Sequence, residues 1–171
     1  PFLETLATCK RMDDRMLAND RSCNWFTATL RNLKPGTTYE YQVGNAKQNH
    51  WSEAAEFITA PDKAGKFSFF FCSDTHNRKD WGDLLTAVFK QHPEAAFCTI
   101  SGDLVGTGLQ RDNWDAFFAY GAPMFTKRSV VPAIGNHDAQ LGLGAGMYLD
   151  IFGLPENGPK DIAPERAYTF T

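Results

Sequence analysis

A short apolar run that ends in an acid and an imidazole constrains the fold of this chain most. Residues 67–76 read FSFFFCSDTH, and a single serine interrupts the apolar part of the run. A segment this short, rich in aromatic residues and bounded by polar ones, predicts a strand that is buried on both faces of a sheet. Charge is not tolerated along such a strand, so we expect Asp74 and His76 at its carboxyl end, where open α/β sheets place their ligands.

Asp74 and His76 are two positions apart, so in an extended chain their side chains point to the same side. A carboxylate oxygen beside an imidazole suits a divalent metal such as Zn, Mn or Fe. This spacing alone is equally compatible with a surface aspartate and an unrelated histidine.

Two later segments end in the same way. Residues 95–101 and 129–134 predict buried strands, and polar residues follow each of them directly. The first ends in Gly102-Asp103 and the second in Gly135-Asn136-His137-Asp138. The three endings follow one another at intervals of roughly 30 residues, the length of one βαβ unit.

Helices are predicted between these strands. Residues 81–91 carry apolar side chains at helical spacing, and residues 110–122 do so as well. Strand, helix, strand, helix, strand indicates a parallel sheet with helices on its faces, so the fold class is α/β. The carboxyl ends of the strands would then gather two carboxylates, an amide oxygen and two imidazoles at one edge, which is difficult to explain by chance.

The N-terminal part has a different pattern. Residues 1–23 are polar and irregular, whereas three runs between residues 25 and 60 alternate with period two and predict a small antiparallel all-β unit. The segment LKPGTTYEYQV resembles the tyrosine corner of fibronectin type III domains, with Tyr39 opening a strand. Residues 49–52 are interpreted as a loop.

Three strands are too few for a complete sandwich. We therefore expect an incomplete fibronectin-like domain over residues 1–60, a linker over 61–66 and the N-terminal half of an α/β catalytic domain over 67–171.

Composition narrows the classes of function that this chain could have. The apolar fraction of 43%, the charged fraction of 22% and the net charge of −3 are those of an ordinary globular protein. Lys and Arg are scattered, so nothing indicates nucleic-acid binding, and no apolar run is long enough to span a bilayer. Cys72 and Cys98 are predicted to be buried free thiols. We expect the protein to be exported, and in that case Cys9 and Cys23 could form a disulfide.

The three polar endings resemble the first three motifs of the calcineurin-like metallophosphoesterases. The preceding β unit makes the chain similar to the purple acid phosphatase-type branch of that family. The resemblance implies a hydrolase of phosphate esters with two divalent or trivalent metal ions, drawn from Fe, Mn and Zn. It implies that one metal is bound by Asp74 and His76, that Asp103 bridges both metals, and that Asn136 binds the second.

The resemblance also implies catalytic roles for His137 and Asp138. His137 would contact the phosphate and assist the leaving group, oriented by Asp138. The chemistry is reasonable, since a shared carboxylate offsets the repulsion between two cations and an imidazole can donate to a departing alkoxide.

The sequence departs from the family pattern in two ways. The purple enzymes carry a tyrosine shortly after the bridging aspartate and a non-ligand at the place of His76, which favours the broader, colourless phosphoesterases here. Moreover, no histidine follows His137, although the family takes later ligands from histidines.

We therefore expect a fragment that is inactive alone, with residues 167–171 starting a missing half. That half, or a second chain, would complete the site. The alternative is a non-catalytic module with this fold that binds a partner.

Overall fold

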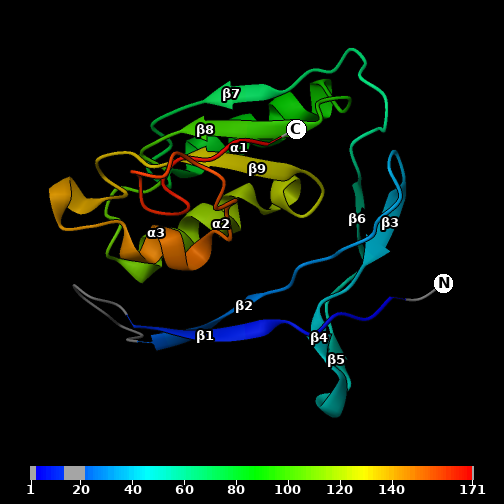
Figure 1. Cartoon of the computed structure of the whole chain (residues 1–171), viewed down its shortest axis with the longest axis horizontal. Helices are drawn as coiled ribbons and strands as arrows, with labels where there is room; N and C mark the ends of the chain where they lie inside the picture. Colours follow the sequence, from blue (N-terminus) through cyan, green and yellow to red (C-terminus); the bar gives the residue numbers. More distant parts are fainter. Residues whose placement is uncertain (1–2, 14–21, 171) are drawn as a thin grey trace.

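The computed structural model describes residues 3–13 and 22–170; most of them form three layers, with the two strand pairs of residues 38–58 beside these (Figure 1). A parallel sheet forms the first layer, helices cover one face of it, and an N-terminal hairpin lies along the outer side of the helices. The sheet strands are β7 (Phe70–Cys72), β8 (Phe97–Ser101) and β9 (Ser129–Ala133). The helices are α1 (Lys79–Gln91), α2 (Arg111–Phe125) and α3 (Gly146–Ile151), with 3-10 turns η1 (Ala46–Gln48) and η2 (Gln140–Gly142).

The sheet has the strand order β7-β8-β9 and all pairs are parallel. The register places Ile100 between Cys72 and Pro132, so the three strands end at the same edge. This arrangement confirms the predicted α/β fold class with a parallel sheet. Because the connections run through α1 and α2, the residues that follow each strand gather at one edge.

The helices bury aromatic side chains between themselves and the sheet. Trp81 of α1 stacks on Phe117 of α2, with ring centroids 5.3 Å apart and 9° between the planes. On the sheet face that these helices cover, Cys98 and Ile100 of β8 have no exposed surface. The helix α3 was not predicted; its Tyr148 is fully buried and donates to the carbonyl of Pro132, 3.1 Å away.

The N-terminal region contains three antiparallel pairs. They are formed by β1 (Thr8–Asp13) with β2 (Ser22–Thr27), β3 (Thr38–Tyr41) with β6 (Ala55–Ile58), and β4 (Gly44–Asn45) with β5 (His50–Trp51). The prediction of irregular structure over residues 1–23 was wrong for β1, and the loop predicted over 49–52 contains β5. Residues 14–21 of the first segment lie outside the described part.

The phenol of Tyr39 bonds back to the backbone that precedes its strand. Its hydroxyl accepts a hydrogen bond from the backbone N–H of Lys34, 2.8 Å away and five residues upstream. Its ring stacks on Phe57 of β6, opposite it in the pair, at 5.7 Å. The phenol therefore joins the turn before β3 to the β3–β6 pair.

The hairpin of β1 and β2 shares a hydrophobic core with the helices. Met12 is 3% exposed, and the ring of Trp25 lies 5.4 Å from that of Phe118 in α2. At the exposed edge of this contact, Lys10 forms an ion pair with Asp150 of α3. The hairpin thus covers the side of the helices that faces away from the sheet.

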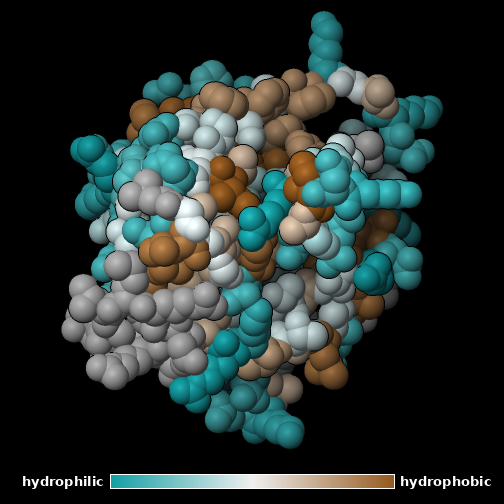
Figure 2. Space-filling view, turned by 60° about the vertical axis from the view of Figure 1, so that its left-hand side comes forward, coloured by the Kyte–Doolittle hydropathy of each residue, from teal (hydrophilic) through white to brown (hydrophobic). Residues whose placement is uncertain are grey.

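The prediction that the strand at residues 67–72 is buried on both faces was wrong. Phe67, Phe69 and Phe71 are 68%, 47% and 68% exposed, because the helices cover only the opposite face. Hydrophobic side chains gather along the upper edge of the molecule in Figure 2, at the height of β7 in Figure 1. We call these three residues, with Phe97, the open aromatic face; Phe69 stacks on Phe97 at 5.0 Å.

All four cysteines are free. Cys98 is buried as predicted, and Cys72 is half-buried. Cys9 lies opposite Phe26 and Cys23 opposite Met12, so the two do not pair.

The C-terminal segment and the helix lengths bear on two further expectations. Residues 167–170 form no strand, contrary to the prediction for this segment, although Phe170 contacts Phe97. Within the described ranges, no helix is long and apolar enough to cross a membrane.

Candidate metal centre

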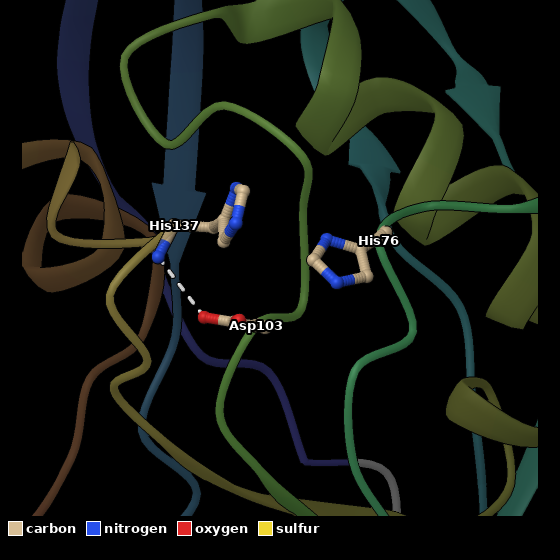
Figure 3. A group of neighbouring side chains, drawn as sticks. All are labelled: His76, Asp103 and His137. Carbon is tan, nitrogen blue, oxygen red and sulfur yellow. Dashed lines mark hydrogen bonds between the residues drawn. The ribbon is translucent and has the colours of Figure 1, made fainter. Parts of the chain in front are cut away.

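Three side chains meet where the parallel strands end. His76 follows β7, Asp103 follows β8 and His137 follows β9, and a potential ligand atom of each lies within 4.8 Å of the other two. Figure 3 shows that they come from three separate loops and face one another. The two imidazole rings are nearly perpendicular, with centroids 4.8 Å apart.

The backbone around this cluster adopts an uncommon conformation. Asp74, His76 and Asp103 all have positive φ angles, of 53°, 44° and 51°. Non-glycine residues seldom occupy this left-handed region, and such residues concentrate at functional sites. Hydrogen bonds between the loops stabilise the conformation here: the N–H of Asp74 donates to Gly102 at 3.1 Å, and that of His76 to Asp103 at 3.0 Å.

Glycines allow the second and third loops to approach each other. Gly102 has a φ of 92°, which favours glycine, and a Cβ on Gly135 would lie 2.1 Å from Oδ1 of Asp103. Gly135 therefore makes room for the carboxylate of Asp103, and Gly102 lets the backbone pass close to Gly135. Asp103 is 9% exposed, and its carboxylate accepts a hydrogen bond from the backbone N–H of His137 at 2.9 Å.

Asp138 is completely buried beneath the loops. Its carboxylate accepts hydrogen bonds from the N–H of Gly135 at 2.8 Å and of Val105 at 3.2 Å, and burial raises its pKa. The ring of His137 is hydrogen-bonded instead to the carbonyl of Gly106, 2.8 Å from Nδ1. Asp138 thus holds the backbone of the second and third loops together, and the orientation of the His137 ring comes from Gly106.

Asp74 and Asn136 lie at the rim of the cluster. The side chain of Asp74 is 66% exposed, with Oδ1 3.9 Å from Nε2 of His76, and Ser73 donates to its other oxygen. Asn136 is exposed and directly precedes His137. Their roles as metal ligands stay predictions.

Comparisons with known proteins agree with the motifs. Residues 67–168 match the family model for calcineurin-like phosphoesterases, which is more than half of the chain. The chain belongs to the calcineurin-like phosphoesterase family. Residues 6–59 match the model described as the N-terminal domain of purple acid phosphatase, so the predicted resemblance is confirmed in both parts.

A solved structure shares the fold. Purple acid phosphatase PPD1 from yellow lupin (Lupinus luteus) seeds superposes with a TM-score of 0.72 at 19% sequence identity. The match covers 91% of this chain and 34% of the lupin chain, so this calcineurin-like phosphoesterase chain spans about a third of that protein. No curated protein matches the sequence.

The donor set at the sheet edge suits the metals that the phosphoesterase family implies. One carboxylate and two imidazoles are suitable ligands for Zn, Mn or Fe, and their ligand atoms lie within 4.8 Å of one another. The residues present therefore fit a divalent cation.

A separate cleft of about 410 Å³ lies at the other end of the strands in this phosphoesterase. Its lining includes Tyr41, Phe57, Phe125 and Lys127, with no carboxylate and no imidazole. Residues near the beginnings of β8 and β9 form one wall. It is therefore distinct from the cluster of His76, Asp103 and His137 at the carboxyl ends of the strands.

Sequence reasoning missed several residues that shape the site. Thr75 is 1% exposed and donates from Oγ1 to the carbonyl of Leu104 at 2.7 Å, joining the first two loops. Asn77 and Asn113 accept hydrogen bonds from the loop that follows Asp103. None of these three residues is a ligand or an acid–base group of the motifs, so the sequence pattern offered no signal for them.

Proposed function

We propose that this chain takes part in the metal-dependent hydrolysis of phosphate esters at a dinuclear centre. The convergence of His76, Asp103 and His137 at the carboxyl ends of three adjacent strands carries the proposal. It unites the ligand types that a hydrolytic metal site needs, on a fold whose family is named for phosphoester chemistry.

The proposed ligand assignment follows the motif order. Asp74 and His76 hold one cation, Asp103 bridges to the other, and Asn136 binds the second. Asp103 is suited to bridging because the N–H of His137 fixes one of its oxygens while the carboxylate remains part of the cluster. Bound cations would polarise the phosphoryl group and supply an activated water.

His137 faces the substrate in this proposal. Its Nδ1 is engaged by the carbonyl of Gly106, so the neutral ring presents an unprotonated Nε2. Nε2 can accept a hydrogen bond or, after taking up a proton, donate to a departing alkoxide. Asp138 contributes by fixing the backbone of the loop that carries His137.

We further propose that the site is completed by ligands beyond those this chain contributes. Its only histidines are His50, His76, His92 and His137, and of these His92 lies at the end of α1 and His50 in β5. The proposal also includes the domain limits 1–60, 61–66 and 67–171. It includes the fibronectin-like character of the first part and export of the protein.

Metal and phosphate titrations test the function. Zn²⁺ or Mn²⁺ is titrated into the metal-free chain, followed by inorganic phosphate, for wild type, Asp103→Asn and Asp62→Asn. Asp62 is an exposed control in the segment before β7, away from the ends of the strands. We expect Asp103→Asn to weaken metal binding by at least about tenfold, Asp62→Asn to leave it unchanged, and phosphate to bind only with metal present.

The outcomes separate the alternatives. Unchanged metal affinity in Asp103→Asn would contradict the assigned centre, and metal binding without any phosphate affinity would favour a non-catalytic module. Hydrolysis of an aryl phosphate by the chain alone should be negligible with added Mn, Zn or Fe. Sustained turnover would contradict the proposal that further ligands are needed.

A further inference from the structure

The ring of His137 is held by a peptide group and not by a carboxylate. The carbonyl of Gly106 lies 2.8 Å from Nδ1. A carbonyl oxygen only accepts hydrogen bonds, so Nδ1 carries the proton of the neutral ring and Nε2 carries the lone pair. Whatever fixes this carbonyl therefore also fixes the tautomer and direction of the imidazole.

The peptide between Gly106 and Thr107 is itself hydrogen-bonded on its other side. The N–H of Thr107, which belongs to the same peptide group as the Gly106 carbonyl, donates to Oδ1 of Asn113 at 3.2 Å. Asn113 lies in the first turn of α2, and its Nδ2 donates to Oε1 of Gln110 at 3.0 Å. That second bond orients the amide so that its oxygen faces Thr107.

Another asparagine anchors the neighbouring peptide. The N–H of Gly106 donates to Oδ1 of Asn77 at 2.9 Å, and Asn77 directly follows His76 in the first loop. Both asparagines pack closely on Gly106: a Cβ there would lie 3.3 Å from Oδ1 of Asn113, a tight contact, and 3.7 Å from Oδ1 of Asn77, an ordinary one. Two amide oxygens thus hold the two N–H groups that flank the carbonyl used by His137.

We propose that Asn113 is a positioning residue that sets the tautomer of His137 through the Gly106–Thr107 peptide, with Asn77 as a second anchor. A peptide whose N–H is hydrogen-bonded is polarised, so its carbonyl becomes a better acceptor. The bond to Nδ1–H is strengthened, and the lone pair of Nε2 stays available on the side of the ring that faces the substrate in the proposed function. The functional meaning of this tautomer rests on the proposed function, whereas the hydrogen-bond chain itself does not.

The test measures the tautomer directly in the metal-free chain. Long-range ¹⁵N–¹H correlation spectra of histidine-labelled protein, recorded where the rings are neutral, distinguish Nδ1–H from Nε2–H; His137→Gln assigns the signals. We expect wild type to show His137 as the Nδ1–H form. In Asn113→Ala the ratio of Nδ1–H to Nε2–H should fall about five- to tenfold, as expected when one hydrogen bond in the chain is lost.

Two further variants distinguish a positioning role of Asn113 from a non-specific effect of substitution on the structure. Asn113→Asp keeps an acceptor oxygen facing Thr107, so it should retain the wild-type tautomer. Asn157→Ala is the matched control, because Asn157 also bonds backbone groups through its amide, in this case those of Thr169. It should leave His137 unchanged, and a shift of similar size in this control would overturn the proposal.

Folding is checked by urea unfolding of each variant. A folded Asn113→Ala with the wild-type tautomer would overturn the proposal. If that variant does not fold, Asn77→Gly decides, because glycine accepts the φ of 45° at this position while removing the oxygen. A shifted tautomer in Asn77→Gly supports the proposal and an unshifted one overturns it.

Metal titration then separates this inference from the proposed function. We expect Asn113→Ala to bind Zn²⁺ as wild type does, because His137 is not among the assigned ligands, so that only the tautomer changes. A shifted tautomer in a chain that binds neither metal nor phosphate would contradict the proposed function and leave the positioning role intact. Metal binding with an unchanged tautomer would contradict the positioning role and leave the proposed function intact.

Discussion

The two faces of the parallel sheet carry similar apolar side chains, and they differ in what covers them. On the face under α1 and α2, Cys98 and Ile100 have no exposed surface. On the other face, Phe69 and Phe71 are 47% and 68% exposed although they belong to the same apolar run as Phe70. An apolar run therefore shows that a strand can be buried, and the neighbouring layers decide whether each face is.

This difference predicts where the stability of the molecule lies. The covered face is continuous with the helices and, through them, with the β1–β2 hairpin. The open aromatic face contributes mainly contacts among its own rings, such as Phe69 with Phe97. Substitutions on the two faces should therefore differ most in their effect on the free energy of unfolding.

The largest effect is expected at the centre of the covered face. Ile100→Ala removes a completely buried side chain and leaves a cavity, which should lower the free energy of unfolding by about 2–5 kcal/mol. Urea unfolding followed by tryptophan fluorescence measures it. A loss below about 1 kcal/mol would mean that the helices do not pack tightly on the sheet, and the contrast between the faces would disappear.

The next effect tests whether the hairpin belongs to the same core. Trp25→Ala removes the ring that contacts Phe118, and we expect a loss of about 2 kcal/mol because Trp25 is only partly buried. Phe26→Ala is the matched control, since Phe26 is the next residue of β2 and is 63% exposed. Equal losses in the two variants would mean that the hairpin is not anchored through this face.

The sequence predicted the parts of the fold that depend on local periodicity. Residues 81–91 were predicted as a helix and α1 spans Lys79–Gln91, because its apolar residues recur at helical spacing. The three polar loop motifs also lie as predicted at one edge of one sheet, since strand order in βαβ units is strongly constrained. These features are encoded within short segments.

Features that depend on distant segments could not be predicted. The strand β1 has the sequence TCKRMD, without apolar alternation, and exists because β2 pairs with it. The left-handed backbone of Asp74 and Asp103 depends on hydrogen bonds between the two loops. For the same reason, the contact of Asn113 with the peptide that holds His137 has no counterpart in any motif.

A smaller effect should appear in the chemistry of the covered face. The sulfur atoms of Cys72 and Cys98 lie 4.0 Å apart, and the hydrogen bond from Cys98 lowers the pKa of Cys72 to about 7. At pH 7 Cys72 should therefore carry more thiolate than an ordinary free thiol, and the thiolate is the form that reacts with iodoacetamide. Cys98→Ala removes the donor, so the pKa of Cys72 should rise toward that of a free thiol and alkylation at pH 7 should slow about tenfold.

Mass spectrometry of the alkylated peptides measures this reaction, with the exposed Cys9 as an internal standard. Cys72→Ala should still leave Cys98 slow to react, because the thiol of Cys98 remains fully buried and burial raises its pKa even without the neighbouring thiol. An unchanged rate for Cys72 in Cys98→Ala would show that the two thiols do not interact.

The smallest effect on stability is expected on the open aromatic face, and consecutive residues of one strand provide the comparison. Phe71→Ser changes a side chain that is 68% exposed, so the free energy of unfolding should stay within about 0.5 kcal/mol of wild type. Phe70→Ser, one position away on the covered face, should cost about 1–3 kcal/mol because its ring packs beside Phe89. The same substitution in the same strand should thus separate the two faces.

Sedimentation velocity adds a second measurement: Phe71→Ser should reduce self-association, since exposed aromatic clusters beside an edge strand promote it. If Phe71→Ser destabilised the chain as much as Phe70→Ser, the open face would have to be covered in solution, and the contrast between the two faces would no longer hold.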